Sequence, residues 1–298
     1  MTTESPSTST NAHAREIVAG ERFAFGANWT AFLSRLNDER IAVAEQALRD
    51  MLGVRDLIGR TFLDVGSGSG LSSLAARRLG ASVVSFDYDP QSVACTEELR
   101  RRYFPEDPTW QVLQGSVLDR AWLTGLGIFD VVYSWGVLHH TGSMWQAMDH
   151  TAAVVKPGGR LFLALYNDQG IRSRIWHRIK RTYCACPRFL RWLVIVPCFV
   201  RLWGPRLIID TLTGNPLRTW RGYGRNRGMS AWHDVVDWVG GYPFEVASPK
   251  ELVRWARERS FDLDVQVTAG GGLGCNQFVW TYTDRSITSA LGTPGISD

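Results

Sequence analysis

A glycine-rich segment follows the first strongly apolar run of the chain. Residues 64–70 read Asp-Val-Gly-Ser-Gly-Ser-Gly. Glycine lets the backbone adopt positive φ and approach a ligand closely, and the start of a helix presents free N–H groups. A nicotinamide-binding loop would read Gly-x-Gly-x-x-Gly, whereas the third glycine here comes one residue earlier, before Leu71. We therefore expect a nucleotide-like ligand other than nicotinamide, bound by Asp64, Gly66, Ser67, Gly68 and Gly70.

A second acid ends the next apolar run, residues 81–86. Asp87 is placed to accept the two ribose hydroxyls of an adenosine. The alternative use of an acid at this point is to cap the following helix. That use suits Asp89 better, because Pro90 fits the first helical turn. Tyr88 could then pack on the adenine, so this segment predicts the nucleoside half of the ligand site.

Four further side chains could transfer protons. His139 and His140 end an apolar run, Asp168 follows the fifth expected strand, and His233 lies in a Trp-His-Asp sequence. Histidine titrates near neutrality, which suits a general base. A histidine that begins a helix is also often merely packed or hydrogen-bonded, so both uses stay open for His139 and His140.

The elements that must position these residues alternate along the chain. Apolar runs predict strands at 61–65, 81–86, 110–113, 129–134, 160–166, 261–268 and 278–283, and helical spacing predicts helices at 28–52, 71–79, 91–103, 144–155 and 249–259. Strands that alternate with helices in this way form a parallel sheet covered on both faces. The sequence therefore predicts an α/β fold with a doubly wound sheet of seven strands.

The alternation stops between the fifth strand and the last helix. Residues 170–228 contain twelve Arg and Lys180 but one acid, Asp210, with aromatic residues interleaved. We expect these domains: 1–14, disordered tail; 15–58, N-terminal helical segment; 59–169, ligand-binding core; 170–247, Arg- and aromatic-rich helical cap insertion; 248–285, end of the core; 286–298, loose tail. The insertion is interpreted as a solvated basic face, as a cap over an anionic or amphipathic substrate, or as a patch for membrane or nucleic acid.

Two later segments carry a family resemblance. Asp130-Val-Val and the Val-Leu-His-His of residues 137–140, together with Lys-Pro-Gly-Gly at 156–159, resemble the class I S-adenosylmethionine-dependent methyltransferases, in particular the type that includes quinone-biosynthesis O-methyltransferases. The resemblance covers about residues 55–167. It implies a Rossmann-like sheet, mostly parallel with an antiparallel last strand, with S-adenosylmethionine as cofactor and S-adenosylhomocysteine as product.

The same resemblance implies where the cofactor contacts fall. It places the Gly66 and Ser134 carbonyls near the cofactor's amino group and Asp87 on the ribose, with Val117 and Trp135 also at the cofactor. Such enzymes usually have an acid where Ser116 stands, so this sequence departs from the pattern there. The segments 25–29, 240–245 and 270–276 resemble parts of a subset of these enzymes. The residues expected at the methyl acceptor are Asn28, Trp29, Tyr166, Asn167, Trp232 and Glu245.

The sequence thus predicts a methyltransferase acting on a small molecule, with O- or N-methylation favoured and an acceptor that is anionic with an apolar part. An RNA methyltransferase and a non-catalytic cofactor-binding protein remain the alternatives, although no nucleic acid is expected as a partner. Five scattered Cys and a net charge of +4 favour a cytoplasmic protein without a metal site. The longest apolar run, 192–200, contains Pro197 and predicts no transmembrane segment. A homodimer is left open.

Overall fold

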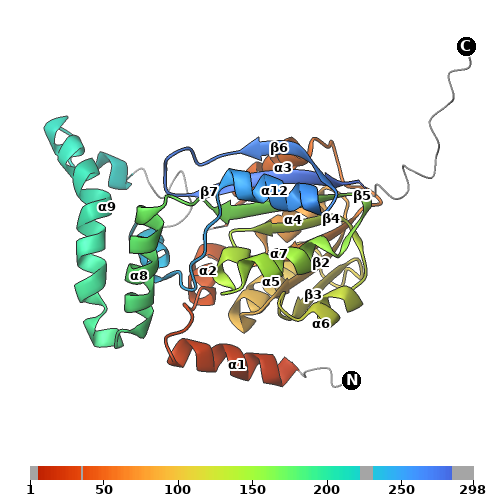
Figure 1. The fold of residues 1–298 in the computed structure, drawn as a ribbon, viewed down its shortest axis with the longest axis horizontal. Coiled ribbons are helices and arrows are strands. Elements are labelled where there is room, and N and C mark those ends of the chain that lie inside the picture. Colours follow the sequence, from red (N-terminus) through yellow and green to blue (C-terminus); the bar gives the residue numbers. More distant parts are fainter. Residues whose placement is uncertain (1–5, 35, 222–230, 284–298) are drawn as a thin grey trace, which may run out of the picture.

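The computed structural model describes residues 6–34, 36–221 and 231–283. Its centre is one seven-stranded sheet in the order β3-β2-β1-β4-β5-β7-β6 (Figure 1). The strands are β1 (Thr61–Val65), β2 (Ser82–Asp87), β3 (Trp110–Gln114), β4 (Phe129–Trp135), β5 (Val155–Tyr166), β6 (Phe261–Val267) and β7 (Cys275–Tyr282). Neighbouring strands from β3 to β5 pair in parallel, and β7 is antiparallel to both β5 and β6. The expected Rossmann-like sheet is confirmed.

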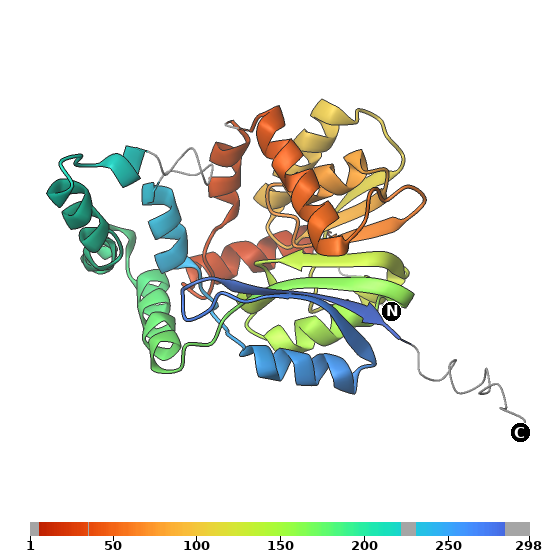
Figure 2. The ribbon, with the colours of Figure 1, turned by 90° about the horizontal axis from the view of Figure 1, so that it is seen from above.

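Helices cover both faces of the sheet. On one face, α3 (Asp38–Leu52), α4 (Leu71–Arg78) and α5 (Pro90–Tyr103) bury their apolar sides in a core with Phe62 and Val83. On the other face, α6 (Arg120–Gly125), α7 (Met144–Ala152) and α12 (Pro249–Glu258) form a second core with Leu163 and Trp280 (Figure 2). Because both faces are buried, the carboxyl ends of the parallel strands are the edge left for a ligand.

The N-terminal region differs from the expected single helix at 28–52. The structure has two helices, α2 (Gly26–Leu33) and α3, because the chain is extended at Asn37. The Asn37 side chain accepts a hydrogen bond from the Arg40 N–H and so starts α3 as its N-cap. A further helix, α1 (Pro6–Val18), occupies part of the segment expected to be a disordered tail. Its His13 is buried, with its ring edge against Tyr88, and this contact holds the helix on the core.

The insertion after β5 is helical in the part of it that the structure describes. It contains α8 (Ile171–Ala185), a 3₁₀ turn at Arg188–Leu190, α9 (Trp192–Leu212) and α11 (Ala231–Gly240). The three helices pack on one another around a third apolar core. Helix α9 forms the end of the molecule farthest from the sheet in both ribbon views (Figures 1 and 2).

The apolar run that contains Pro197 belongs to a longer helix. Helix α9 continues through Pro197 and Pro205, because a proline removes one backbone hydrogen bond without having to stop a helix that is held by packing. Residues Arg188–Leu212 are, by length and composition, apolar enough to cross a bilayer. The helix is longer than the nine-residue apolar run, and length and composition alone do not make it a membrane span.

Candidate active site

The glycine loop joins β1 to α4, and sterics require its glycines. Gly66 has φ of +79°, and a Cβ there would lie 2.3 Å from a methyl of Val137. Gly70, the N-cap of α4, has φ of +80°, and its Cβ would lie 2.8 Å from the backbone of Thr96. Both contacts are far shorter than van der Waals distance. Because these positions carry no side chain, the backbone at the start of α4 can approach a ligand closely.

Asp87 is hydrogen-bonded to the glycine loop. Its Oδ2 accepts from the Gly68 N–H at 2.9 Å, and its Oδ1 accepts from the Asp89 N–H at 2.9 Å. A carboxylate has about four lone-pair positions, so beside these two bonds and one from the Tyr88 backbone Asp87 keeps acceptor capacity for a ribose hydroxyl. Burial raises the pKa of Asp87 to about 6. As expected, Asp89 is the residue that caps α5, by accepting from the Gln91 N–H.

Asp64 lies beneath the loop in a buried chain of hydrogen bonds. The Trp110 indole donates to Ser85 at 2.9 Å, Ser85 donates to Ser73 at 2.7 Å, and Ser73 donates to Asp64 at 2.5 Å. Burial raises the pKa of Asp64 to about 7. This chain joins β3, β2, α4 and β1, so Asp64 fixes the start of α4 against the sheet.

Several expected cofactor residues direct their side chains at the protein itself. Ser67 bonds to Thr96 at 2.9 Å, and Ser134 donates to the Val65 carbonyl at 2.9 Å. Ser116 accepts from the Leu118 N–H, the Val117 carbonyl is 2.9 Å from a ring nitrogen of His150, and the Trp135 indole donates to Gln277. A ligand would therefore contact the backbone of Ser67 and Ser134 rather than their side chains. The roles of these residues stay predictions.

The N-terminal helices cover the cofactor side of this edge. The Trp29 indole lies 3.2 Å from the place a Gly68 Cβ would occupy, so it contacts the glycine loop rather than the predicted acceptor region. Next to it, the Tyr88 hydroxyl donates to Glu16 at 3.0 Å, and the Arg22 guanidinium lies 5.1 Å from the Tyr88 ring centre. Helices α1 and α2 thus form one wall of the candidate nucleoside site.

His139 and His140 lie together on the 3₁₀ turn after β4, and their hydrogen bonds distinguish them. Nδ1 of His140 lies 2.6 Å from the Pro243 carbonyl oxygen. A carbonyl only accepts, so Nδ1 carries the proton and Nε2 keeps the lone pair. Nδ1 of His139 accepts from the Tyr166 N–H at 3.2 Å, so its proton is on Nε2, a buried atom without a hydrogen-bond partner. Burial lowers the pKa of both rings, that of His140 to about 3.

Aromatic rings and one buried lysine surround these histidines. The Tyr166 ring stacks 3.8 Å from the His139 ring and meets Trp238 and Phe244 at 5.3 Å each. Lys180 donates to the Trp238 carbonyl, and its Nζ lies 4.2 Å from the Trp238 ring centre. Burial lowers the pKa of Lys180 to about 7. A small hollow adjoins the cluster, lined by Tyr166, Asn167, Gln169, Ser173, Trp176, Trp238, Phe244, Leu273 and Gly274.

Lys180 and Asp237 were not among the predicted site residues. Lys180 is buried on the face of α8 that also carries Trp176 and Cys184, each four residues away, and a lysine on an otherwise apolar helical face was the available signal. Asp237 on α11 accepts a hydrogen bond from the Asn28 side chain. Burial, and then the charge of Asp234, raises the pKa of Asp237 to about 7.

The side chains of the remaining predicted residues bond away from this histidine–tyrosine cluster, although the Glu245 N–H donates to the His139 carbonyl and Asn167 lines the hollow. Asp168 is exposed and accepts from the Gly170 N–H at 2.8 Å. Glu245 accepts from the Met144 N–H at the start of α7. Asn167 bonds to Asn276 and to the Gly270 carbonyl, and Trp232 is exposed and packs on Phe199 in the cap. His233 lies in α11, but its side chain is outside the described residues.

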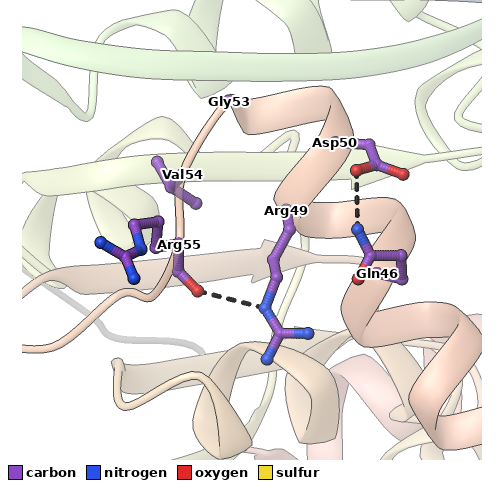
Figure 3. Close-up of a pocket in the computed structure, with 6 residues that line it drawn as sticks. All are labelled: Gln46, Arg49, Asp50, Gly53, Val54 and Arg55. Carbon is purple, nitrogen blue, oxygen red and sulfur yellow. Dashed lines mark hydrogen bonds between the residues drawn. The ribbon is translucent and has the colours of Figure 1, made fainter.

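A second hollow, shown in Figure 3, lies far from these groups. Residues at the end of α3 and in the loop after it line this hollow. Within it, Gln46 donates to Asp50, and Arg49 donates to the Arg55 carbonyl. The loop leads into the first residue of β1, at the opposite end of that strand from the glycines, so this hollow takes no part in the site.

Comparison with known proteins identifies the class of the core. A family model described as a methyltransferase domain matches residues 63–161. Residues 63–161 are therefore similar to methyltransferase domains, and the order of strands in the sheet agrees with the Rossmann-like fold expected from the sequence.

Curated relatives share the name ubiquinone biosynthesis O-methyltransferase. The protein from Methylobacterium sp. (strain 4-46) is 31% identical over 168 residues, 52% of this chain and 64% of the relative. The one from Rhizobium johnstonii is 28% identical over 172 residues, 54% of this chain and 62% of the relative. The chain therefore spans less than two thirds of the length of these relatives. A crystal structure of magnesium protoporphyrin IX methyltransferase from Synechocystis PCC 6803 overlaps 82% of this chain and 84% of its own, at 12% identity and a TM-score of 0.49.

Proposed function

We propose that the protein transfers a methyl group from S-adenosylmethionine to an oxygen or nitrogen of a small-molecule acceptor. The observation that carries the proposal is the hydrogen bond between Gly68 and Asp87. It ties the acid at the end of β2 to the glycine loop after β1, so one rigid unit presents a ribose acceptor beside an open helix start. The match to the methyltransferase domain supports this use.

The residues present fit the cofactor. The backbone of residues 66–70 would hold its methionine part, Asp87 its ribose and Tyr88 its adenine, while Trp29 excludes water from the loop. The cofactor supplies a methyl group on a positively charged sulfur, and the protein contributes position and desolvation to an in-line displacement. The chain supplies no electrophile of its own in this scheme.

His140 is the residue best placed to accept the proton that a hydroxyl or amine nucleophile releases. Its Nε2 lone pair is fixed by the Nδ1 bond to Pro243, whereas the basic nitrogen of His139 is already used by Tyr166. Burial lowers the pKa of His140 to about 3, so its imidazole is neutral at ordinary pH but a weak base. It takes the proton as the methyl group arrives, when the positive charge leaving the sulfur makes the nucleophile's proton strongly acidic. His139 then acts by orienting Tyr166.

Lys180 and the aromatic rings support an acceptor that is acidic and partly apolar. An ammonium buried among Trp238, Phe244 and Tyr166 would be stabilised by an anionic oxygen of the acceptor, while the rings hold a hydrophobic body. The names of the curated relatives favour oxygen as the atom methylated. An RNA acceptor remains the alternative that the exposed arginines of the cap support.

Calorimetry with S-adenosylhomocysteine tests the cofactor half of the proposal. The wild-type protein should bind, Asp87→Ala should lose binding, and Asp119→Ala should keep it, because Asp119 only caps α6. No binding by the wild-type protein would overturn the proposal. Transfer of a labelled methyl group from the cofactor to small-molecule and RNA fractions of a cell extract then tests the acceptor, and label confined to RNA would overturn the small-molecule half.

A further inference from the structure

Helix α9 exposes a long apolar surface at the outer end of the molecule. Large apolar side chains of the 3₁₀ turn and α9 are exposed in sequence order: Phe189, Trp192, Leu193, Val196, Val200, Ile208, Ile209 and Leu212. They span five turns of one helix. Contiguous apolar surfaces of this kind mark interaction sites, because single scattered hydrophobic residues are the normal case on a soluble surface.

The opposite side of α9 is fixed to the protein. Ile195, Cys198 and Trp203 are buried in the third core, against α8 and α11. Asp210 is also buried and accepts two hydrogen bonds from Thr219. Lipid therefore cannot surround the helix unless this core opens. The geometry allows α9 to lie along an apolar surface with one side immersed, and it argues against α9 crossing a bilayer alone.

Along the chain segment that contains α8 and α9, the charges are nearly all of one sign. In residues 171–221 the sole acid is the buried Asp210. Exposed arginines lie on α8, on the turn, on α9 and just after it: Arg172, Arg174, Arg178, Arg181, Arg188, Arg201, Arg206, Arg218 and Arg221. Helix α9 is apolar around most of its circumference and one side of it is packed, so an exposed apolar side accompanied by a cluster of arginines is what an anionic bilayer would meet.

We propose that the surface formed by residues 188–212 attaches the protein to the face of an anionic lipid bilayer. The exposed apolar side chains enter the boundary between headgroups and acyl chains, and the exposed arginines contact lipid phosphates. The helix axis lies in the plane of the membrane, and the sheet domain stays in water. This attachment does not depend on the proposed methyl transfer.

Flotation of the full-length protein with vesicles tests the proposal. Vesicles of phosphatidylcholine alone are compared with vesicles of equal parts phosphatidylcholine and phosphatidylglycerol. The wild-type protein should float with the anionic vesicles and less with the neutral ones, and added salt should weaken binding. No flotation, or equal flotation with both compositions at every salt concentration, would overturn the proposal.

A matched pair of variants locates the attachment. Val200 on α9 is 60% exposed and Val43 on α3 is 65% exposed, both within helices. Val200→Asp should weaken partitioning into anionic vesicles about tenfold, and Val43→Asp should leave it unchanged, with both variants checked by circular dichroism. Equal effects of the two would refute the assignment. Ultracentrifugation without lipid tests whether a second copy of the chain binds this surface instead. If the wild-type protein binds no vesicles and forms a dimer that Val200→Asp dissociates, the proposal is overturned in favour of a dimer interface.

Discussion

Nδ1 of His140 lies 2.6 Å from the carbonyl oxygen of Pro243, in the segment that joins α11 to α12. The bond fixes both the tautomer and the orientation of the ring. It also makes the proton acceptor of the proposed reaction dependent on the chain that follows the cap. The core and the insertion therefore position His140 together.

His140→Gln should lower kcat for a hydroxyl or amine acceptor by roughly 100- to 10,000-fold, the usual contribution of a general base. Affinity for S-adenosylhomocysteine should not change, since the cofactor contacts lie elsewhere. His177→Gln is the matched control, because His177 also has Nδ1 near a carbonyl, that of Phe244, but is exposed. If His140→Gln keeps the wild-type kcat, another group must accept the proton.

Lys180 should produce a pH dependence near neutrality. Burial lowers its pKa to about 7, so the side chain is charged below this pH and neutral above it. For an anionic acceptor, KM should rise as the pH increases through 7. Lys180→Met should raise KM at low pH and remove the dependence, whereas Lys250→Met, on the surface of α12, should retain it. An unchanged pH profile in Lys180→Met would show that the lysine does not meet the acceptor.

Asp237 should reduce stability as the pH rises from about 4 to about 7. Its pKa in the folded protein is raised to about 7 from an ordinary 3.8, so within this window the folded state binds more protons than the unfolded state. Stability due to this group is present below the unfolded pKa and is lost as the pH approaches 7. Asp237→Asn keeps an acceptor for Asn28 and should flatten Tm against pH in this window. A parallel pair of curves would contradict the assignment.

Trp29→Ala should weaken cofactor binding more than acceptor binding, because the indole lies on Gly68. Loss of this cover should raise the Kd for S-adenosylhomocysteine about 10- to 100-fold. Trp145→Ala, a partly exposed indole on α7, controls for the removal of a tryptophan. Calorimetry gives the Kd, and steady-state kinetics gives the KM of the acceptor. If only the KM of the acceptor changes, Trp29 contacts the acceptor rather than the cofactor.

Gly66→Ala should destabilise the protein more than Gly158→Ala. Both residues have positive φ, +79° and +73°, which costs alanine about 1–2 kcal/mol. Only at Gly66 would the new Cβ also meet Val137, at 2.3 Å, whereas nothing lies within 4 Å at Gly158. Overpacking should add about 1–3 kcal/mol. Urea unfolding measures both, and equal losses would mean that the loop can move away from Val137.

The part of the site that the sequence predicted is the part carried by local pattern. The spacing of Gly66, Gly68 and Gly70 after an apolar run is visible in one stretch of chain, and so is the acid Asp87 at the end of the next run. Strand periodicity and turn residues then predict the sheet that holds them. Neither the glycine loop nor the sheet requires knowledge of contacts between distant segments to be predicted.

The rest depends on contacts between distant segments. Asn28 meets Asp237, and Trp29 meets Gly68, although nothing in residues 25–29 says which part of the core they cover. Lys180 is one cation in a run of arginines, and its burial follows from how α8 packs on α11. The length of α9 was not predicted because tertiary packing, rather than local propensity, decides whether a helix continues through its two prolines.

The bond between Asn28 and Asp237 joins α2, which carries Trp29 over the glycine loop, to α11, which carries Trp238 beside Tyr166 of the histidine–tyrosine cluster. The two covers of the site are thereby mechanically linked. If α11 moves to admit an acceptor, it pulls on the helix that shields the loop, and the spent cofactor gains a route out. Product release and reloading would then occur in one opening event, so both ligands should exchange at a common rate.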